Sequence, residues 1–200
     1  MNVGTDVGAA LASRFEILDQ VGRGTMATVY RGRSLESGDE VAIKVVDLED
    51  PRFDANEREE QQRRFMQEAD AQRRLSHPNL VQVYDYGHTS RHLYLVMEFV
   101  GGGTLDQRLK TAPMSPKDAV VVARQIAHGL GAAHELGFVH RDLKPANVLL
   151  DDTYSPPLAK ITDFGLVKDL EDQVSATKTG QMLGTPMYMA PEQIRGEEVD

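Results

Sequence analysis

One segment of the sequence, FVHRDLKPANVLL at residues 138–150, limits the folds open to this chain more than any other. Its two ends are apolar and have the character of buried strands, whereas its middle is crowded with polar side chains. These are His140, Arg141, Asp142, Lys144 and Asn147. Burying charged groups without partners is costly, and a solvated turn has no need of apolar flanks on both sides. The segment therefore predicts a rigidly anchored loop whose polar side chains point into a cleft.

The composition narrows the class of protein. The chain has 200 residues, which is enough for one sizeable core or for two small lobes that share a cleft. Its net charge of −9 argues against nucleic acid as a partner, and the lack of cysteine excludes disulfides and thiolate metal sites. No apolar run approaches the roughly 20 residues of a membrane-spanning helix, and the first residues do not form a secretory signal. We expect a cytoplasmic chain, with a membrane anchor beyond residue 200 left open.

The first half of the chain has the pattern of a small β-rich lobe over residues 15–100. We expect residues 1–14, which are small and polar, to be a flexible leader. Short β-branched runs then alternate with turn residues, and residues 37–39 have the composition of a hairpin turn. Residues 57–75 contain neither glycine nor proline and predict a helix. One face of this helix would carry Phe65, Glu68, Ala69, Gln72 and Leu75.

A glycine-rich connector, VGGGT at residues 100–104, predicts a boundary, after which residues 101–200 form a second, mainly helical lobe. Thr104, with Gln107 three residues later, forms a capping box for a short helix. Ser115 and Pro116 suit the N-cap and first turn of a long helix. We expect the core face of that helix to consist of Ala119, Val122, Ala123, Ile126, Ala127, Leu130 and Ala133.

The segment VGRGTMATV, residues 21–29, places two glycines between two expected strands. Gly22 and Gly24 would let backbone N–H groups approach a phosphate closely, although a plain hairpin turn would explain the same two glycines. The third small position of a G-x-G-x-x-G pattern holds Ala27. Taken singly, this segment is weak evidence for a nucleotide site.

Three other charged residues raise the question of a partner. Lys44 ends the strand VAIK, where a lysine would ordinarily extend its ammonium group to water. Glu68 lies within the apolar stripe of the expected helix, so a pair with Lys44 would satisfy both and fix the ammonium charge. Asp163 follows an apolar run in KITDFGLVKD. It is either a turn former or, together with Asn147, a source of oxygen ligands for Mg²⁺.

These segments follow one another in a definite order: the glycine loop, VAIK, an acidic helix, H-R-D-L-K-P-x-N, D-F-G, and A-P-E at residues 190–192. In this order and at these intervals, the chain resembles the eukaryotic-type protein kinase family from about residue 15 to residue 200. The resemblance implies a two-lobe α+β fold, with a small antiparallel β lobe carrying one main helix and a larger, mostly helical lobe. It further implies that the second lobe is truncated after the activation segment, so that residues 1–200 alone would be poorly soluble and nearly inactive.

The resemblance implies ATP and Mg²⁺ as cofactors and gives a role to each motif. Asp142 would accept the proton of the attacking hydroxyl, and Lys144 would stabilise the transferring phosphoryl group. Lys44, paired with Glu68, would contact the α- and β-phosphates, while Asn147 and Asp163 would hold Mg²⁺. The other residues implied to contact ATP are Val21, Gly22, Arg23, Gly24, Thr25, Met26, Ala27, Thr28, Val29, Ala42, Glu98, Val100 and Leu149.

The same resemblance implies serine and threonine acceptors on protein substrates. Lys144, two residues after Asp142, and Thr185 in the segment GTPMYMAPE are similar to serine/threonine kinases, and the brief activation loop is similar to bacterial members. Arg141 directly before Asp142 is typical of kinases that activation-loop phosphate switches on. The resemblance therefore implies autophosphorylation at Thr177 or Thr179, with self-association of two copies for the reaction in trans.

Two positions depart from the family pattern. Gln72 is polar where many members place an apolar residue, and Thr104 stands where animal kinases often have an acidic residue that contacts ribose. Two alternatives remain beside an active kinase. A pseudokinase would bind nucleotide and regulate a partner without catalysis, although the five residues that distinguish the two are intact. They are Lys44, Glu68, Asp142, Asn147 and Asp163. A small-molecule phosphotransferase ranks last, because it should lack A-P-E and the HPNLV segment.

Overall fold

The computed structural model describes residues 5–24, 27–50, 58–164 and 186–195. The chain divides into two compact units. Unit 1 consists of residues 1–74 and 82–99, and unit 2 consists of residues 75–81 and 100–200. Each unit has its own buried apolar clusters.

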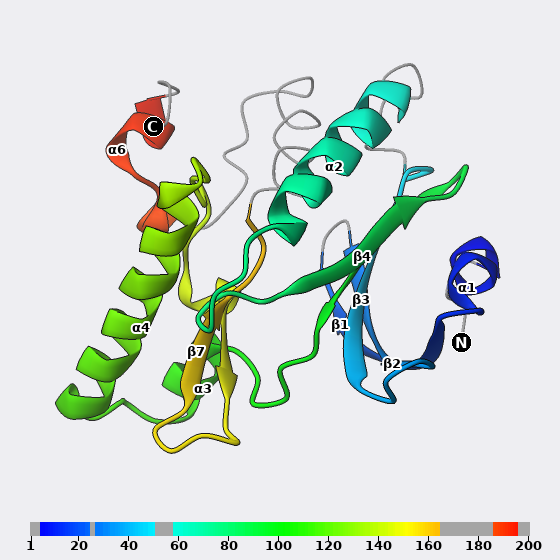
Figure 1. The fold of residues 1–200 in the computed structure, drawn as a ribbon. Helices are drawn as coiled ribbons and strands as arrows, with labels where there is room; N and C mark the ends of the chain where they lie inside the picture. The colour runs from blue at the N-terminus through cyan, green and yellow to red at the C-terminus, as the bar shows by residue number, and fades with distance from the viewer. Residues whose placement is uncertain (1–4, 25–26, 51–57, 165–185, 196–200) are drawn as a thin grey trace. The chain divides into compact units, whose positions relative to one another are not determined.

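Unit 1 is built on a five-stranded antiparallel sheet with strand order β1-β2-β3-β5-β4 (Figure 1). Along β3, the side chains of Val41, Ile43 and Val45 belong to one buried apolar cluster, and the residues between them face the opposite side of the sheet. Gly38 adopts a φ of 79° in the turn between β2 and β3, which confirms the hairpin predicted at residues 37–39. The strands are β1 (Phe15–Arg23), β2 (Ala27–Ser34), β3 (Glu40–Asp47), β4 (Val83–His88) and β5 (His92–Glu98).

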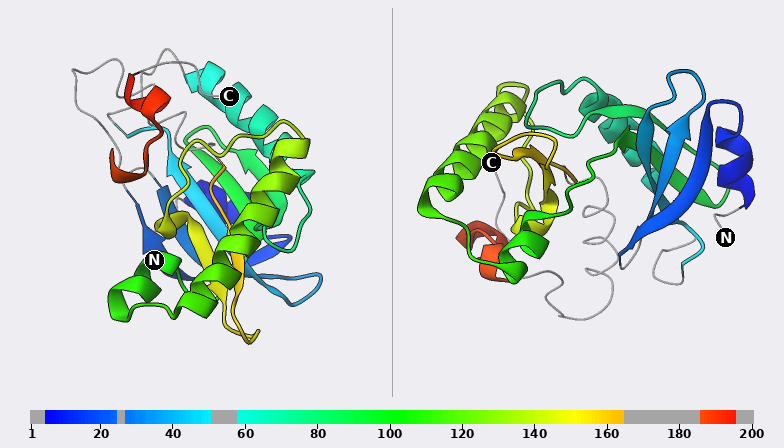
Figure 2. Two further views of the ribbon diagram at one scale, coloured as in Figure 1. Left: turned by 90° about the vertical axis from the view of Figure 1, so that its left-hand side faces the viewer. Right: turned by 90° about the horizontal axis from the view of Figure 1, so that it is seen from below.

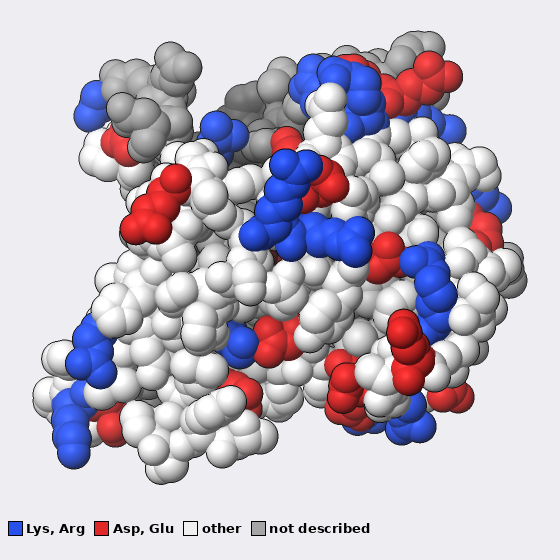
Figure 3. All heavy atoms as spheres, in the orientation of Figure 1, with Lys and Arg blue, Asp and Glu red and all other residues white. Residues whose placement is uncertain are grey.

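Helix α2 (Arg58–Arg73) packs against β4 and β5 and confirms the helix predicted in this region. Its buried residues include Phe65, Ala69 and Gln72, which recur on the predicted face, while Glu68 is half-buried. The exposed side of α2 carries ion pairs between residues three or four positions apart, such as those of Glu60 with Arg63 and Arg64. Basic and acidic side chains accordingly lie next to one another over α2 in Figure 3.

The expectation of a flexible leader over residues 1–14 is wrong for the part of it that the structure describes. Residues Thr5–Leu11 form helix α1, which lies on the side of the sheet opposite to α2 (Figures 1 and 2). Val7 and Leu11 are fully buried and pack in the cluster that contains Ile43 and Tyr94. The composition of this segment is small and polar, but its two larger apolar residues, four positions apart, share one helical face and cover the sheet.

A polar contact ties α1 to the turn between β4 and β5. The Asp6 carboxylate accepts a hydrogen bond from Thr89 Oγ1 at 2.6 Å and lies 3.0 Å from His92 Nδ1. Partial burial opposes ionisation of Asp6, but the hydrogen bonds from Thr89 and His92 and the charge of His92 outweigh it and lower the Asp6 pKa to about 2. Asp6 therefore stays ionised at neutral pH and holds the N-terminal end of α1.

Removing the buried end of α1 is expected to destabilise unit 1. Leu11→Ala should lower the free energy of unfolding by about 2–5 kcal/mol, because a fully buried leucine is replaced by a cavity. Leu109→Ala is the matched control, since Leu109 is 43% exposed and should change stability by about 0.5 kcal/mol or less. Urea unfolding measures both variants. An unchanged midpoint for Leu11→Ala would show that α1 does not belong to the core.

Unit 2 contains a two-stranded antiparallel sheet and several helices (Figure 2). One apolar cluster lies between α3, α4 and the β6–β7 pair and includes Leu105, Val122 and Leu150. The Thr104–Gln107 capping box and the Ser115 N-cap followed by Pro116 are both present as predicted. The elements are α3 (Leu105–Thr111), α4 (Pro116–Glu135), the 3₁₀ helix η1 (Pro145–Asn147), β6 (Val148–Asp151), β7 (Leu158–Ile161), the 3₁₀ helix η2 (Pro186–Tyr188) and α6 (Pro191–Arg195).

The division of the chain differs from the predicted boundary between residues 100 and 101. Residues 75–81, which were expected in the first lobe, belong to unit 2. Leu75 and Leu80 pack with Ile161 and Ala133, and the backbone of Asn79 and Ile161 is hydrogen-bonded at 2.9 Å. Val100 also falls in unit 2. These contacts join residues that are distant in the sequence, such as Asn79 and Ile161, so no local pattern could indicate them.

The glycines of the connector are required by packing. A Cβ on Gly102 would lie 2.1 Å from the Leu150 carbonyl oxygen, and Gly103 has a φ of 77°. The Gly103 carbonyl in turn accepts a hydrogen bond from the Leu150 N–H at 2.9 Å. The connector is therefore anchored on β6, because only glycine lets the two backbones approach this closely.

Helix α4 buries a narrower stripe than the sequence predicts. Val122 and Ala133 are buried as expected, and Gly129 is buried between them. Ala119, Ala123 and Ala127, which were also assigned to the core, are exposed. The 3.6-residue period was correct. Alanine, however, is small and is found on buried and exposed helix faces alike, so the sequence pattern could not show which of these alanines face the core. None of the helices among the residues described above is long and apolar enough to cross a membrane.

Candidate active site

The loop at residues 140–147 is anchored at both ends in unit 2. His140 is buried at 2% exposure, and its Nε2 lies 2.9 Å from the Thr162 carbonyl oxygen. At the other end, η1 leads directly into β6, whose Val148 and Leu150 are buried. This arrangement bears out the rigidly anchored loop that the apolar flanks predicted.

The electrostatic state of His140 follows from its surroundings. Burial lowers the His140 pKa, against the opposing effects of the hydrogen bond to Thr162 and of two nearby carboxylates. The neutral ring then donates from Nε2 to Thr162 and presents Nδ1 as an acceptor to the Asp142 N–H, 3.3 Å away. His140 therefore connects the loop to the end of β7 without carrying a charge.

The Asp142 carboxylate is held by two neighbours within the loop. Lys144 Nζ donates to Asp142 Oδ2 at 2.7 Å, and Asn147 Nδ2 donates to the same oxygen at 3.1 Å. The side chains of Asp142 and Lys144 are only 23% and 24% exposed, so their charges are partly withdrawn from solvent. Such charge-assisted hydrogen bonds fix the direction of the carboxylate.

Asn147 is buried at 8% exposure, and its side-chain nitrogen also donates to the Asp142 backbone carbonyl at 2.8 Å. Both bonds use the nitrogen of the amide, an orientation that presents the amide oxygen as the atom for a cation. Within the described parts of the chain, no group of three or more His, Cys, Asp or Glu side chains could hold a metal ion. One amide oxygen and one carboxylate suit Mg²⁺, which takes few protein ligands and completes its shell with phosphate and water.

Asp163 and Phe164 follow β7 directly. Asp163 has a φ of 63°, an uncommon conformation for a residue other than glycine, and its side chain is exposed. Phe164 is buried and stacks at a tilt on the His140 ring, with 4.6 Å between the ring centroids. The Thr162 N–H donates to the Asn147 carbonyl at 3.0 Å. The loop at residues 140–147 and the start of D-F-G thus form one connected cluster.

The predicted nucleotide residues of unit 1 lie on strands β1–β3 and in the β1–β2 loop, apart from Glu98 at the end of β5. Gly22 pairs with Val29 and Arg23 with Thr28, and the Gly24 N–H donates to the Ala27 carbonyl at 2.8 Å. The glycine loop is therefore a closed β-hairpin at its base. Val21, beside the strand irregularity at Gly22, is 47% exposed, while Thr25 and Met26 lie outside the described residues.

Lys44 lies on β3, where it pairs with Val29 of β2 and Leu95 of β5, and it is half-buried. Ala42, two residues earlier, faces the same side of the sheet and is buried. Glu68 belongs to the same unit, on α2. The Lys44–Glu68 ion pair stays a prediction.

Glu98, the last residue of β5, is one of the predicted adenine contacts. The Glu98 N–H donates to the Gln82 carbonyl at 2.9 Å, so this N–H is already used within the sheet region. Its carboxylate accepts from the Gln82 N–H at 3.3 Å. Val100 and Leu149 are both half-buried, in unit 2. Thr104 uses its side chain to cap α3 through Gln107, which supports the doubt about a ribose contact there.

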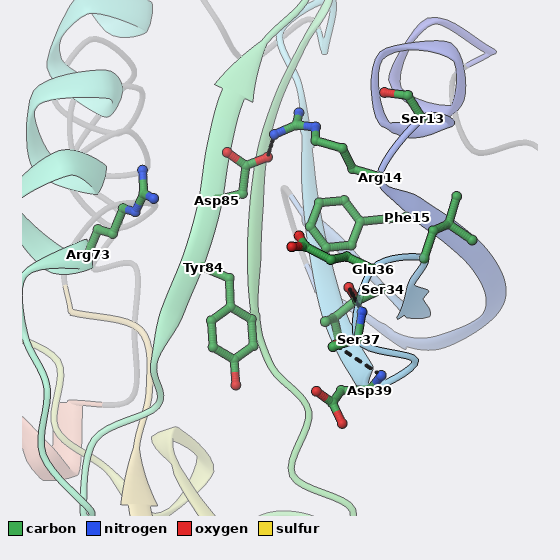
Figure 4. A pocket seen from close by; sticks show the side chains of 12 residues that line it. Ser13, Arg14, Phe15, Ser34, Glu36, Ser37, Asp39, Arg73, Tyr84 and Asp85 are labelled. Atoms are coloured by element: carbon green, nitrogen blue, oxygen red, sulfur yellow. Dashed lines mark hydrogen bonds and ion pairs between the residues drawn. The ribbon is translucent and has the colours of Figure 1, made fainter.

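A pocket of about 600 Å³ in unit 1 contains none of the predicted site residues (Figure 4). Arg14 on its wall forms an ion pair with Asp85 at 2.6 Å. Val41 in its lining belongs to the apolar cluster on the side of the sheet away from Lys44. This pocket is therefore a separate feature and not the place where the glycine loop would hold a phosphate.

One contact of the loop was not foreseen from the sequence. The side chain of Gln193, on α6, donates from Nε2 to the Arg141 carbonyl oxygen at 2.6 Å. The only available sequence signal was its position three residues after Ala190, where a glutamine can cap the start of a helix. The activation-loop residues Thr177, Thr179 and Thr185 lie outside the described residues.

Comparison with known proteins agrees with these motifs. Residues 15–200 match the family model described as protein kinase domain. The chain is 42% identical over 193 residues to serine/threonine-protein kinase PknL of Mycobacterium bovis, covering 96% of this chain and 46% of that protein. It is 41% identical to the probable serine/threonine-protein kinase PknB of Lactococcus lactis, covering 95% of this chain and 29% of that protein.

Among solved structures, the chain resembles that of Rad53 residues 1–466 in complex with AMP-PNP, with a TM-score of 0.73 and 30% sequence identity. The similarity covers 92% of this chain and 43% of the Rad53 chain. The chain thus spans less than half the length of each of these relatives. Both the fold and the sequence support the same assignment, and the chain belongs to the protein kinase domain family, as a member of its bacterial serine/threonine branch.

Proposed function

We propose that this chain provides the catalytic machinery of an enzyme that transfers the γ-phosphate of ATP to serine and threonine hydroxyls of protein substrates. The observation that carries the proposal is the Asp142 carboxylate, which Lys144 and Asn147 hold from within one anchored loop. The side chains of Asp142 and Lys144 are largely withdrawn from solvent, and the buried His140 accepts from the Asp142 N–H. This arrangement supports a role for Asp142 as a general base whose carboxylate is oriented in advance.

The residues of unit 2 would act directly on the acceptor hydroxyl and the phosphoryl group. Asp142 would accept a hydrogen bond from the substrate hydroxyl and orient its oxygen toward the γ-phosphorus. It would take the hydroxyl proton as the new P–O bond forms, while the bond from the γ-phosphorus to the β–γ bridging oxygen breaks and ADP leaves. The ammonium group of Lys144, 2.7 Å from Asp142, provides positive charge beside the phosphoryl oxygens. Catalysis of this kind consists mainly of positioning and charge neutralisation.

Mg²⁺ would be held by the amide oxygen of Asn147 and the carboxylate of Asp163. When bound, it neutralises charge on the phosphate oxygens of ATP. The Asn147 side-chain nitrogen donates to Asp142, so the same side chain would both position the base and coordinate the metal. The exposed carboxylate of Asp163 extends from a backbone that the His140–Phe164 stacking holds in place.

The residues of unit 1 would bind the nucleotide. N–H groups of the glycine loop, including those of Gly22 and Gly24, would cover the phosphates, and Lys44 would contact the α- and β-phosphates while paired with Glu68. Val21, Val29, Ala42 and Leu149 would contact the adenine ring. The Glu98 N–H donates to the Gln82 carbonyl, so Glu98 would contact adenine through its own carbonyl. Val100 would provide the other backbone contact.

Protein substrates and serine/threonine preference are supported by the names of the relatives, which are serine/threonine-protein kinases. We further propose autophosphorylation at Thr177 or Thr179, by two copies that act on one another. A phosphothreonine carries about −1.5 to −2 charges and would pair with Arg141, next to the base.

The test is a transfer assay on the full-length protein. Incubation with Mg²⁺ and γ-labelled ATP should label the protein itself and an added protein acceptor, and acid hydrolysis should release phosphoserine or phosphothreonine. Mapping should find phosphate at Thr177 or Thr179, and replacing both by alanine should lower the rate. A protein that binds ATP but transfers nothing would be a pseudokinase, and phosphate elsewhere alone would contradict the proposed site.

A further inference from the structure

The peptide group that immediately precedes Asp142 is held at both of its ends. Its N–H, which belongs to Asp142, donates to the His140 carbonyl at 2.8 Å. Its carbonyl, which belongs to Arg141, accepts from Gln193 Nε2 at 2.6 Å. Gln193 lies 52 positions further along the chain, yet in the same unit. A peptide held in this way has little freedom to rotate, and its orientation determines where the Asp142 side chain begins.

The backbone at this point needs such support. Arg141 has a φ of 60°, in the left-handed region that residues other than glycine seldom occupy. A conformation of this kind persists only where surrounding contacts hold it. The hydrogen bond from Gln193, which is distant in the sequence, is one of these contacts. It stabilises the Arg141 carbonyl in the direction that the left-handed conformation imposes.

Both polar atoms of the Gln193 side-chain amide form hydrogen bonds. While Nε2 donates to Arg141, Oε1 accepts a hydrogen bond from the Ala190 N–H at 3.1 Å. The oxygen therefore caps the five-residue helix α6, and the nitrogen reaches the loop. Only a side chain that carries a donor and an acceptor side by side can do both, and a glutamate in the same place could only accept.

We propose that Gln193 is a positioning residue that couples the A-P-E segment to the catalytic base, by fixing the peptide group before Asp142. This inference rests on the proposed kinase function. A change in the conformation of residues 190–195 would then alter the orientation of the peptide group before Asp142, and with it the position of the base. Loss of the bond should lower turnover without weakening ATP binding, because Gln193 contacts the loop and not the nucleotide.

The test compares two substitutions in the full-length protein. Gln193→Glu keeps the acceptor for Ala190 and the size of the side chain, but replaces the donor to Arg141 by a carboxylate oxygen that repels the carbonyl. Gln193→Met removes both bonds at nearly the same size. Gln62→Glu is the matched control, since Gln62 also donates to a backbone carbonyl, that of Thr89 at 3.4 Å, but does so in unit 1.

We expect both Gln193 variants to lose about 10- to 100-fold in kcat, the scale expected for misplacing a catalytic group by a fraction of an ångström to 1 Å. Their KM for ATP and their melting temperatures should stay close to the wild-type values. If Gln193 only caps α6, Gln193→Glu should keep the wild-type kcat, and kcat should fall only in Gln193→Met. That result would overturn the inference.

Hydrogen exchange supplies a readout that does not depend on activity. The peptide covering residues 138–147 should exchange faster in both Gln193 variants than in the wild type and in Gln62→Glu. Unchanged exchange in Gln193→Glu would refute the positioning role even if the wild-type protein transferred no phosphate. An inactive wild type would refute the proposed function alone, so the two failures can be told apart.

Discussion

Asp142→Asn is expected to abolish most phosphoryl transfer while leaving nucleotide binding intact. Asparagine has the same shape and can still accept hydrogen bonds from Lys144 and Asn147, so the loop should keep its structure. It cannot take the proton of the acceptor hydroxyl. Loss of a positioned general base lowers rates by about 10²- to 10⁴-fold, and we expect kcat to fall within or beyond that range.

The control for this substitution is Asp106→Asn. Asp106 forms an ion pair with Lys110 at 2.7 Å, the same separation as that between Asp142 and Lys144, but on the exposed surface of α3. It should change neither kcat nor ATP affinity. Single-turnover kinetics and ATP titration measure the two quantities separately. Transfer by Asp142→Asn at a rate within tenfold of wild type would remove Asp142 from the role of base.

The second large effect is expected at Asp163. If Asp163 and Asn147 hold Mg²⁺, the protein should be stabilised by ATP clearly more in the presence of Mg²⁺ than in its absence. A ligand that binds only the folded state at about 100 times its Kd adds about 2.7 kcal/mol, so loss of the metal should be visible in the melting temperature. Asp163→Ala should abolish the Mg²⁺-dependent increment and should reduce transfer strongly.

Two further variants make this result specific to the metal. Alanine is strained at the φ of 63° found for Asp163, so Asp163→Asn, which tolerates this conformation better, tests whether charge alone is responsible. Asp152→Ala removes an exposed aspartate that pairs with Arg108, and its increment should equal that of the wild type. A full increment in both Asp163 variants would exclude Asp163 from the metal site.

The sequence alone was sufficient to predict that the loop at residues 140–147 is anchored at both ends, because its flanks are apolar. Its polar residues predicted a cleft-facing cluster, because burying unpaired charge is costly, and the cleft and its chemistry stay predictions. Elements with strong local signals were also correct, such as the β2–β3 hairpin, the caps of α3 and α4, and α2 within two residues at its end. These features depend on neighbouring residues, and neighbours are visible in a sequence.

Tertiary structure decided the features that depend on contacts between distant residues. Helix α1 has only seven residues, too few for stable helix in isolation, and it exists because Val7 and Leu11 enter the core of unit 1. Residues 75–81 join unit 2 because they pair with Ile161 and its neighbours. The bond from Gln193 to the Arg141 carbonyl is of the same kind. A single glutamine has no pattern that indicates a partner 52 residues away, so only the folded chain shows that the A-P-E segment reaches the peptide before Asp142.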